Sequence, residues 1–565
     1  MAELKSCKIC KLNYQVTDDD LKFYESVSPV FNGKKYFIPS PTLCPNCRQQ
    51  RRLSFCNEFN LYPGECGMCK KRTLTEHPPH ANQPIYCKEC WHSDKWEPRD
   101  FGREVDFGRP FFDQVHDLKS SVPAQALTID GENLNCDYMH YAGSSKNCYL
   151  IMHADFCENC SYGYGFKKVI SCVDGFYNLH SELCYDCVDV YKCYGLKGCQ
   201  DCVNCSSSAF LRDCIGCQNC FLSVGLRNKQ YYFQSKQLSK EEYESKMREI
   251  DLGSYTQYQK CHARLKELEK DYCFKQFHTT NVQNCSGDYL KNCKDVQFGF
   301  DCEDVEGGKY LFQMVLGSKN VYDIYQYGTN LQASYECCIS GANGYGLVFT
   351  LDGHMSSKNL AYCWYIEHGE NLFGCVSMHH RSYCILNKQY TQEEYEALVP
   401  KVIEHMQKSN EWGEFFDSKI ALFGYNKTTA QMWFPMKKED VLTRGWKWDE
   451  YESERPNVVS VIKAADLPDN ISDVDDEILQ AAIECEESGK LFKLTPFELS
   501  FYRDNRLPLP RKAFYQRNLA RFARRNPRKF YKRSCEKCSK EILTTYTKEL
   551  AAKVCCEECY MKAVY

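Results

Sequence analysis

Two short stretches near the ends of the chain carry cysteines at the spacing of metal ligands. A Cys-x-x-Cys turn supplies two thiolates from one tight loop, and zinc takes four such ligands in a tetrahedron. Six of these motifs pair into three sets. The first set is Cys7, Cys10, Cys44 and Cys47; the second is Cys66, Cys69, Cys87 and Cys90; the third is Cys535, Cys538, Cys556 and Cys559. We therefore expect about three bound zinc ions.

The gaps between paired motifs distinguish the sets. In the second and third sets 17 residues separate the two motifs, which is within the range of zinc ribbons. The first set has a longer insert, residues 11–43. A site with four cysteine ligands has no open position for a catalytic water, so each set predicts a structural metal. Cys555, beside the third set, is interpreted as a spare thiol, and His77 and His80 as surface residues.

The middle of the chain uses cysteine differently. Fourteen cysteines share one phase of a three-residue period, with recurrent spacings of 12 and 15, and Asn or Asp often precedes them. They are Cys136, Cys148, Cys157, Cys160, Cys172, Cys184, Cys187, Cys193, Cys199, Cys202, Cys205, Cys214, Cys217 and Cys220. An Asx residue favours a turn and tolerates the left-handed region. We predict a narrow β-solenoid with Asn at its corners and buried cysteine in its core.

Two other uses of these sulfur atoms stay open. The runs Cys199-x-x-Cys202-x-x-Cys205 and Cys214-x-x-Cys217-x-x-Cys220 match the first three ligands of a bacterial iron–sulfur motif, without its continuation. The alternatives to inert core thiols are therefore iron–sulfur clusters, or additional zinc or another soft metal.

A second lobe repeats the first. The tripeptide Ser-Lys-Asn at residues 145–147 recurs at 318–320 and 357–359, and Asx-Cys units resume at Cys285. Each lobe ends in Lys-Gln-x-Ser/Thr-x-Glu-Glu-Tyr-Glu, at residues 236–244 and 388–396. Ser239 with Glu242 and Thr391 with Glu394 fit a helix capping box. We expect a duplicated unit of solenoid and capping helix.

Positive charge is concentrated near the C-terminal end of the chain. The net charge is −4, yet residues 500–533 contain twelve Lys or Arg and one acid. A helix is expected over residues 512–525, with Tyr515, Leu519 and Phe522 as an apolar stripe that docks on the protein. Arg517, Arg521 and Arg524 would lie on the opposite face, as a ladder of guanidinium groups toward solvent.

Such a ladder suits the phosphates of RNA or DNA. The predicted contact residues are Arg511, Lys512, Arg517, Arg521, Arg524, Arg525, Arg528, Lys529, Lys532 and Arg533. The alternative is an intramolecular face neutralised by acids at 473–476. Binding to partner proteins is a further alternative.

Several motifs resemble those of a cysteine-rich, multi-zinc-ribbon protein family of candidate-phyla (patescibacterial) bacteria. They are the Asx-Cys repeats, the two lobe endings, Trp-His-Ser-Asp-Lys-Trp at 91–96, Leu-Pro-Leu-Pro-Arg at 507–511, Arg-Asn-Pro-Arg-Lys at 525–529, and the closing Cys-x-x-Cys-Tyr at 556–560. The resemblance covers most of the chain. It implies no particular activity and no catalytic residues.

The remaining features narrow the class of protein. The segment after Met1 has no apolar core of a secretory signal, and no apolar run approaches the length of a membrane span, so we expect a cytoplasmic protein with reduced thiols. An enzyme is the weaker alternative. Its candidate nucleophile pair, His379 or His380 with nearby Cys375 or Cys384, has no third group in the sequence to orient it.

The predicted fold is multidomain and mainly β: zinc ribbons flank a duplicated Asx-Cys β-solenoid with capping helices, and a basic helical and zinc-ribbon module follows. The predicted segments are an N-terminal zinc-binding module (1–60), a zinc ribbon (61–110), a linker helix (111–134), solenoid lobe 1 (135–235), a helical linker (236–272), solenoid lobe 2 (273–388), a capping helix (389–410), an irregular acidic linker (411–490), a basic helical segment (491–533) and a C-terminal zinc ribbon (534–565). We expect a non-enzymatic protein that binds zinc and nucleic acid or acts as a scaffold.

Overall fold

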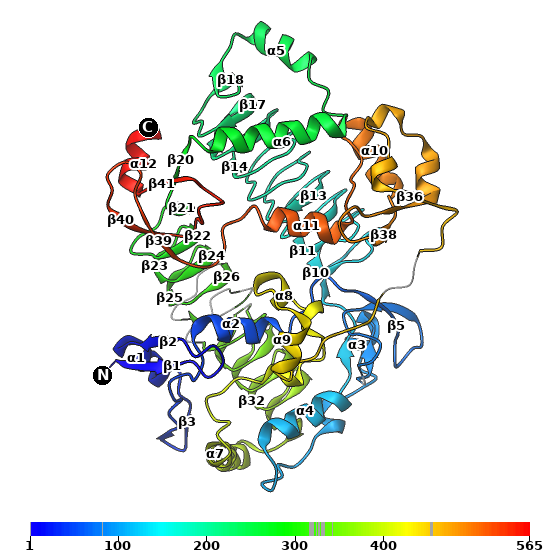
Figure 1. Ribbon diagram of the computed structural model, residues 1–565. Helices are drawn as coiled ribbons and strands as arrows, with labels where there is room; N and C mark the ends of the chain where they lie inside the picture. Colours follow the sequence, from blue (N-terminus) through cyan, green and yellow to red (C-terminus); the bar gives the residue numbers. More distant parts are fainter. Residues whose placement is uncertain are drawn as a thin grey trace. The chain divides into compact units, whose positions relative to one another are not determined.

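A computed structural model describes residues 2–81, 83–315, 321–323, 325, 328, 334–341, 343–452 and 456–564 (Figure 1). The predicted fold class is confirmed: the chain is mainly β, with two β-solenoids, short helices and clustered cysteines. It forms two compact units, each made of two separate segments. Unit 1 contains residues 1–127 and 277–451, and unit 2 contains residues 128–276 and 452–565. Each solenoid therefore shares its unit with a module from one end of the chain.

The solenoid of unit 2 repeats every 12 residues. Parallel pairing joins His140 to Met152, Met152 to Tyr164, and Gln218 to Gln230. Its strands include β10 (His140–Gly143), β11 (Met152–Asp155), β12 (Ser161–Tyr164), β13 (Val173–Phe176), β15 (Ala209–Arg212), β17 (Gln218–Val224) and β18 (Gln230–Phe233). The 12-residue turn explains why cysteines recur at this spacing.

Left-handed backbone recurs at every third residue of this solenoid. Asn135, Asn147 and Asn159 have positive φ angles, as predicted for the corners, and so do Tyr141 and Leu150, at 48° and 53°. Such angles cost L-residues roughly 1–2 kcal/mol each, so neighbouring turns must impose them. The corner amides stack as predicted: Asn135 Nδ2 donates to Asn147 Oδ1 at 3.2 Å, and Asn147 Nδ2 donates to Asn159 Oδ1 at 3.0 Å.

Cysteine fills the solenoid core because each side of a turn is only three residues long, which leaves little room for larger side chains. Cys160, Cys172, Cys184 and Cys214 are fully buried. Many of these thiols donate to the carbonyl oxygen two residues earlier; Cys160 Sγ lies 3.3 Å from the oxygen of Glu158. This packing confirms that the cysteines of the repeat point into the core.

The second solenoid lies in unit 1. Its strands include β22 (Gly287–Lys291), β24 (Gly299–Glu303), β26 (Phe312–Val315), β28 (Tyr345–Val348), β30 (Lys358–Ala361), β31 (Trp364–Glu367), β32 (Glu370–Phe373), β33 (Val376–His379) and β34 (Ser382–Ile385). Most turns again have 12 residues, and the pairing of Tyr345 with Lys358 spans 13. The predicted Ser-Lys-Asn repeat at 318–320 lies outside the described residues.

Helices follow each solenoid as predicted. α5 (Lys240–Arg248) and α7 (Gln392–Lys408) begin at complete capping boxes formed by Ser239 with Glu242 and by Thr391 with Glu394. α6 (Tyr255–Glu269) packs on β15 and β17, and α4 (Phe111–Ser121) occupies part of the predicted linker.

The segment expected to be an irregular linker is more ordered than predicted. It contains α8 (Thr429–Trp433), α9 (Lys438–Thr443), β36 (Ser460–Lys463) and β37 (Ala481–Glu484). The first two helices belong to unit 1, whereas both strands belong to unit 2. The acids between 469 and 487 lie on short turns and β37.

His77, predicted to lie at the surface, is buried. Cys555 lies outside the third tetrad, as predicted, but it is not a spare thiol, because it forms a disulfide with Cys273. The disulfide joins β20 (Cys273–Lys275) to β41 (Lys553–Cys555), two parallel strands of unit 2. The partners are 282 residues apart, so sequence spacing could not reveal the pair. In the described part of the chain, no helix could span a lipid bilayer.

Candidate metal centres and arginine clamps

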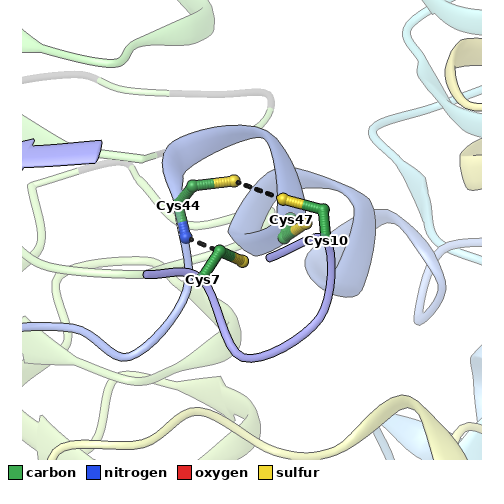
Figure 2. Close-up of side chains that lie close together, drawn as sticks. All are labelled: Cys7, Cys10, Cys44 and Cys47. Carbon is green, nitrogen blue, oxygen red and sulfur yellow. Dashed lines mark hydrogen bonds between the residues drawn. The ribbon is translucent and has the colours of Figure 1, made fainter. Parts of the chain in front are cut away.

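The structure brings together the four sulfur atoms of each predicted set. In every set, all Sγ atoms lie within 4.8 Å of one another. Figure 2 shows this convergence for the first set, where Cys10 Sγ and Cys44 Sγ are 3.7 Å apart. The twelve predicted ligands therefore form three tetrads, each of which can hold a metal ion.

The first half of each tetrad lies on a β-hairpin. The hairpins are β1 (Glu3–Ser6) with β2 (Asn13–Val16), β5 (Tyr62–Glu65) with β6 (Arg72–Thr75), and β39 (Tyr531–Ser534) with β40 (Glu541–Thr544). At the tips, Lys11, Lys70 and Ser539 adopt φ angles of 60–63°. Each donates its N–H to the carbonyl of the first cysteine at 2.9–3.0 Å. This turn places both sulfur atoms on one side.

The second half of each tetrad begins a helix. Cys44, Cys87 and Cys556 immediately precede α2 (Pro45–Leu53), α3 (Lys88–Trp91) and α12 (Glu557–Val564). The backbone N–H of each donates to the sulfur of the first cysteine of its set, at 3.3–3.4 Å. Positive partial charge at a helix N-terminus stabilises anionic ligands. Peptide dipoles thus favour thiolates in all three tetrads.

The pKa values of the thiols reflect this arrangement. Hydrogen bonding from Cys47 lowers the pKa of Cys44 to about 5. Burial raises the pKa of Cys66, but backbone N–H groups, including those of Cys69 and Cys87, outweigh burial and lower the pKa to about 6. The pKa of Cys535 falls to about 6 for the same reasons. Each tetrad therefore has one thiol that ionises readily, as metal binding requires.

The predicted arginine ladder does not face solvent. α11 (Phe514–Phe522) is shorter than predicted, and Arg517 and Arg521 on it are 8% and 2% exposed. Arg517 Nη1 lies 2.9 Å from Asp174 Oδ2, and Arg521 Nη2 lies 3.1 Å from Asp174 Oδ1. Asp174 is on a solenoid corner of the same unit and is 1% exposed. The arginine face is therefore the one that docks.

Neighbouring arginines extend this contact. Arg524 Nη2 lies 2.6 Å from Asp186 Oδ1, and Arg525 Nε lies 3.2 Å from Asp189 Oδ1. The apolar stripe of Tyr515, Leu519 and Phe522 is only half-buried. The predicted orientation of the helix was wrong. Three corner aspartates of the solenoid, Asp174, Asp186 and Asp189, form ion pairs with the arginines, and these pairs hold the arginine face against the solenoid.

The remaining predicted nucleic-acid residues have varied surroundings. Arg511 stacks over the Tyr255 ring, Lys512 pairs with Glu487, and Arg533 donates to carbonyls including that of Ala551. Arg528 is half-buried, whereas Lys529 and Lys532 are exposed.

Unit 1 contains a matching set of buried charges. Arg48 and Arg52 on α2 pair with Asp323 and Glu336, and all four are at most 1% exposed. Asp323 and Glu336 also adopt left-handed corner conformations in their solenoid. We call the two sets the arginine clamps: the unit 1 clamp is Arg48 and Arg52 with Asp323 and Glu336, and the unit 2 clamp is Arg517 and Arg521 with Asp174 and Asp186. In each, arginines four residues apart meet acids on successive turns.

The matching clamps reflect an internal repeat that sequence reasoning missed. A constant offset of 469 residues relates Arg48 to Arg517, Arg52 to Arg521, and every cysteine of the second set to one of the third. Upstream, an offset of 478 relates Cys7 to Cys485. Equal gaps in two ribbons and a shared Cys-x-x-Cys-aromatic ending were the available signals.

The repeat contains a fourth hairpin-and-helix site that has cysteine at only one of the four ligand positions. The backbone carbonyl of Cys485 accepts a hydrogen bond from Gly489 N–H, and the N–H of Cys485 donates to Lys490 O, both at 2.9 Å. The backbone of Cys7 makes the same two hydrogen bonds with Lys11 and Leu12. Ser488, Ala513 and Gln516 occupy the positions of the other three cysteines. We call Cys485, Ser488, Ala513 and Gln516 the degenerate tetrad. Its helix α11 still carries the clamp, so docking does not need a metal at that position.

The other chemical candidates do not form reactive pairs. His379 Nδ1 lies 3.2 Å from Glu367 Oε2, and its ring packs against Trp91, while His380 stacks on His368. Cys375 and Cys384 point into the core and donate to backbone carbonyls. Among the described residues, the predicted iron–sulfur runs contribute only Cys199 to any close group of three sulfur atoms.

Comparison with protein-family models, curated proteins and solved structures found no significant match. The resemblance to a cysteine-rich bacterial family therefore stays a prediction. Any function has to be argued from the tetrads, clamps and solenoids themselves.

Proposed function

We propose that this protein is a non-enzymatic zinc-binding scaffold. In unit 1, the module of the first cysteine tetrad docks on a β-solenoid through an arginine clamp. In unit 2, the module of the degenerate tetrad docks on the other solenoid in the same way. The observation that carries this proposal is the shared geometry of the three tetrads, in which four sulfur atoms from a hairpin and a helix start converge. Four thiolates in this arrangement suit zinc and leave no position for a catalytic water.

The metal has a structural task because the modules have little core of their own. Around the first and second tetrads, the buried apolar cluster consists largely of the cysteines themselves. Small modules of this kind fold with the metal, so binding energy becomes folding energy. The folded module then positions Arg48 and Arg52 of α2 for the clamp of unit 1.

The test is the metal content of anaerobically purified full-length protein. We expect about three zinc ions per chain and no iron. Cys66→Ser should remove one zinc, whereas Cys261→Ser, a control at a buried cysteine outside every tetrad, should remove none. Iron in the protein, or unchanged zinc in Cys66→Ser, would contradict the proposal.

Nucleic-acid binding is a second candidate function. Because the arginines of α11 are buried, the candidate surface is the one around the third tetrad. Lys529, Lys532, Lys537 and Lys540 are exposed around this module. A binding surface made of such charges gives affinity that falls steeply with salt. Replacing all four by Ala should abolish binding of a single-stranded oligonucleotide, while Lys146→Ala and Lys168→Ala, on the solenoid, should not. Equal binding by both variants would exclude this surface.

A further inference from the structure

The first solenoid gathers three sulfur atoms at one point in its core. Cys184, Cys187 and Cys199 have Sγ atoms within 4.8 Å of one another. Cys187 and Cys199 are one 12-residue turn apart, and Cys184 lies on the adjacent side. In the described part of the chain, this is the only such group of three cysteines outside the tetrads. We call it the sulfur triad.

The surroundings of the triad are closed to solvent but not wholly apolar. Its three cysteines are 0–2% exposed, and Val190 and Leu196 pack in the same core. Asn178, also fully buried, donates its Nδ2 to Cys187 Sγ at 3.4 Å. Its Oδ1 has no hydrogen-bond partner among the described residues. A buried amide that donates to a ligand sulfur orients that ligand and tunes the metal that it holds.

Coordination number and charge decide which ion fits this group. Zinc takes four ligands, and the triad supplies three. Three thiolates around Zn²⁺ leave a charge of −1, and three around Cu⁺ leave −2. Burying a net charge costs several kcal/mol per ion in real proteins. A trivalent soft ion with three thiolates is neutral, so a core closed to solvent favours it.

We propose that Cys184, Cys187 and Cys199 form a three-coordinate site for trivalent arsenic. Arsenous acid, As(OH)₃, is neutral and reacts with three thiols. Three As–S bonds form, the three thiol protons leave with the three hydroxyl groups, and three water molecules are released. Arsenic stays trivalent, no redox partner is needed, and no charge enters the core. Soft thiolate ligands match a soft ion.

The experiment uses zinc-loaded full-length protein under anaerobic conditions with arsenite alone as the probe. Protein is treated either in its native state or during refolding, desalted, and analysed for arsenic and zinc together. We expect about one retained arsenic per chain with the zinc content unchanged. Because the triad is closed to solvent, uptake in the native state should be slow and uptake during refolding fast.

Matched variants locate the bound arsenic. Cys187→Ser should reduce arsenic to background, whereas Cys214→Ser, at a fully buried core cysteine outside the triad, should retain it. Zinc content and circular dichroism report whether each variant folds. If Cys187→Ser does not fold, Asn178→Leu is the second variant, and it should weaken retention. Arsenic bound only with release of zinc, equal retention by the variants, or none under either treatment would overturn the proposal. The zinc count tests the scaffold function separately.

Discussion

Replacing Asp174 by asparagine should loosen the docking of α11 on the solenoid of unit 2. Asparagine keeps the shape of the side chain and tolerates the left-handed corner. However, it removes the negative charge that faces Arg517 at 2.9 Å and Arg521 at 3.1 Å. Arg517 would keep Glu498 at 3.2 Å and Arg521 would keep Asp186 at 3.8 Å, so each buried guanidinium group would lose one of its two carboxylate partners. Removing one partner of a buried pair costs about 3–5 kcal/mol, and the remaining carboxylates place this substitution at the lower end of that range. A ladder facing solvent would lose only about 0–1 kcal/mol.

Native-state hydrogen exchange of α11 measures this loss. Each 1.4 kcal/mol corresponds to a tenfold change, so amides of α11 should exchange roughly two orders of magnitude faster. Glu158→Gln is the control, because it breaks an exposed ion pair with Lys146 in the same unit. All seven tryptophans lie in unit 1, so their fluorescence transition should not change. Acceleration below about fivefold, equivalent to 1 kcal/mol, would refute the buried clamp.

Three further outcomes are expected. Burial lowers the pKa of His262 to about 4 despite nearby Asp186, so the folded state disfavours protonation of this side chain. The free energy of unfolding should therefore fall by up to about 3 kcal/mol as the pH drops from about 6.5 to 4. In urea titrations, His262→Gln should lack this part of the pH dependence. Cys273→Ser should lower the free energy of unfolding of unit 2 by about 2–4 kcal/mol, and thiol labelling of the unreduced wild type should miss Cys273 and Cys555. The triple variant Ser488→Cys, Ala513→Cys and Gln516→Cys should raise the zinc count by one in metal analysis. An unchanged count would show that the degenerate tetrad cannot assemble.

Local patterns explain what could be predicted. The ligands of a Cys-x-x-Cys turn are three residues apart, so their convergence is a property of one hairpin. The capping boxes at Ser239 and Thr391 act within one helical turn. The solenoid cysteines all fall in the same phase of a three-residue period because each 12-residue turn consists of four sides of three residues. In each case the interacting groups are close in sequence or repeat at a fixed interval.

Tertiary contacts decided the rest. Helical spacing separated the two faces of α11, but only the corner carboxylates of the solenoid made the arginine face the buried one. Arg517 and Asp174 are 343 residues apart in sequence. A charge run looks the same whether it meets phosphate or a distant carboxylate, because sequence records the charge and not its partner. The sequence by itself therefore determined which twelve cysteines form the tetrads and what period the solenoid has. The folded structure determined where the arginines bind, which thiols form the disulfide and where three sulfur atoms meet, since long-range packing selects those partners.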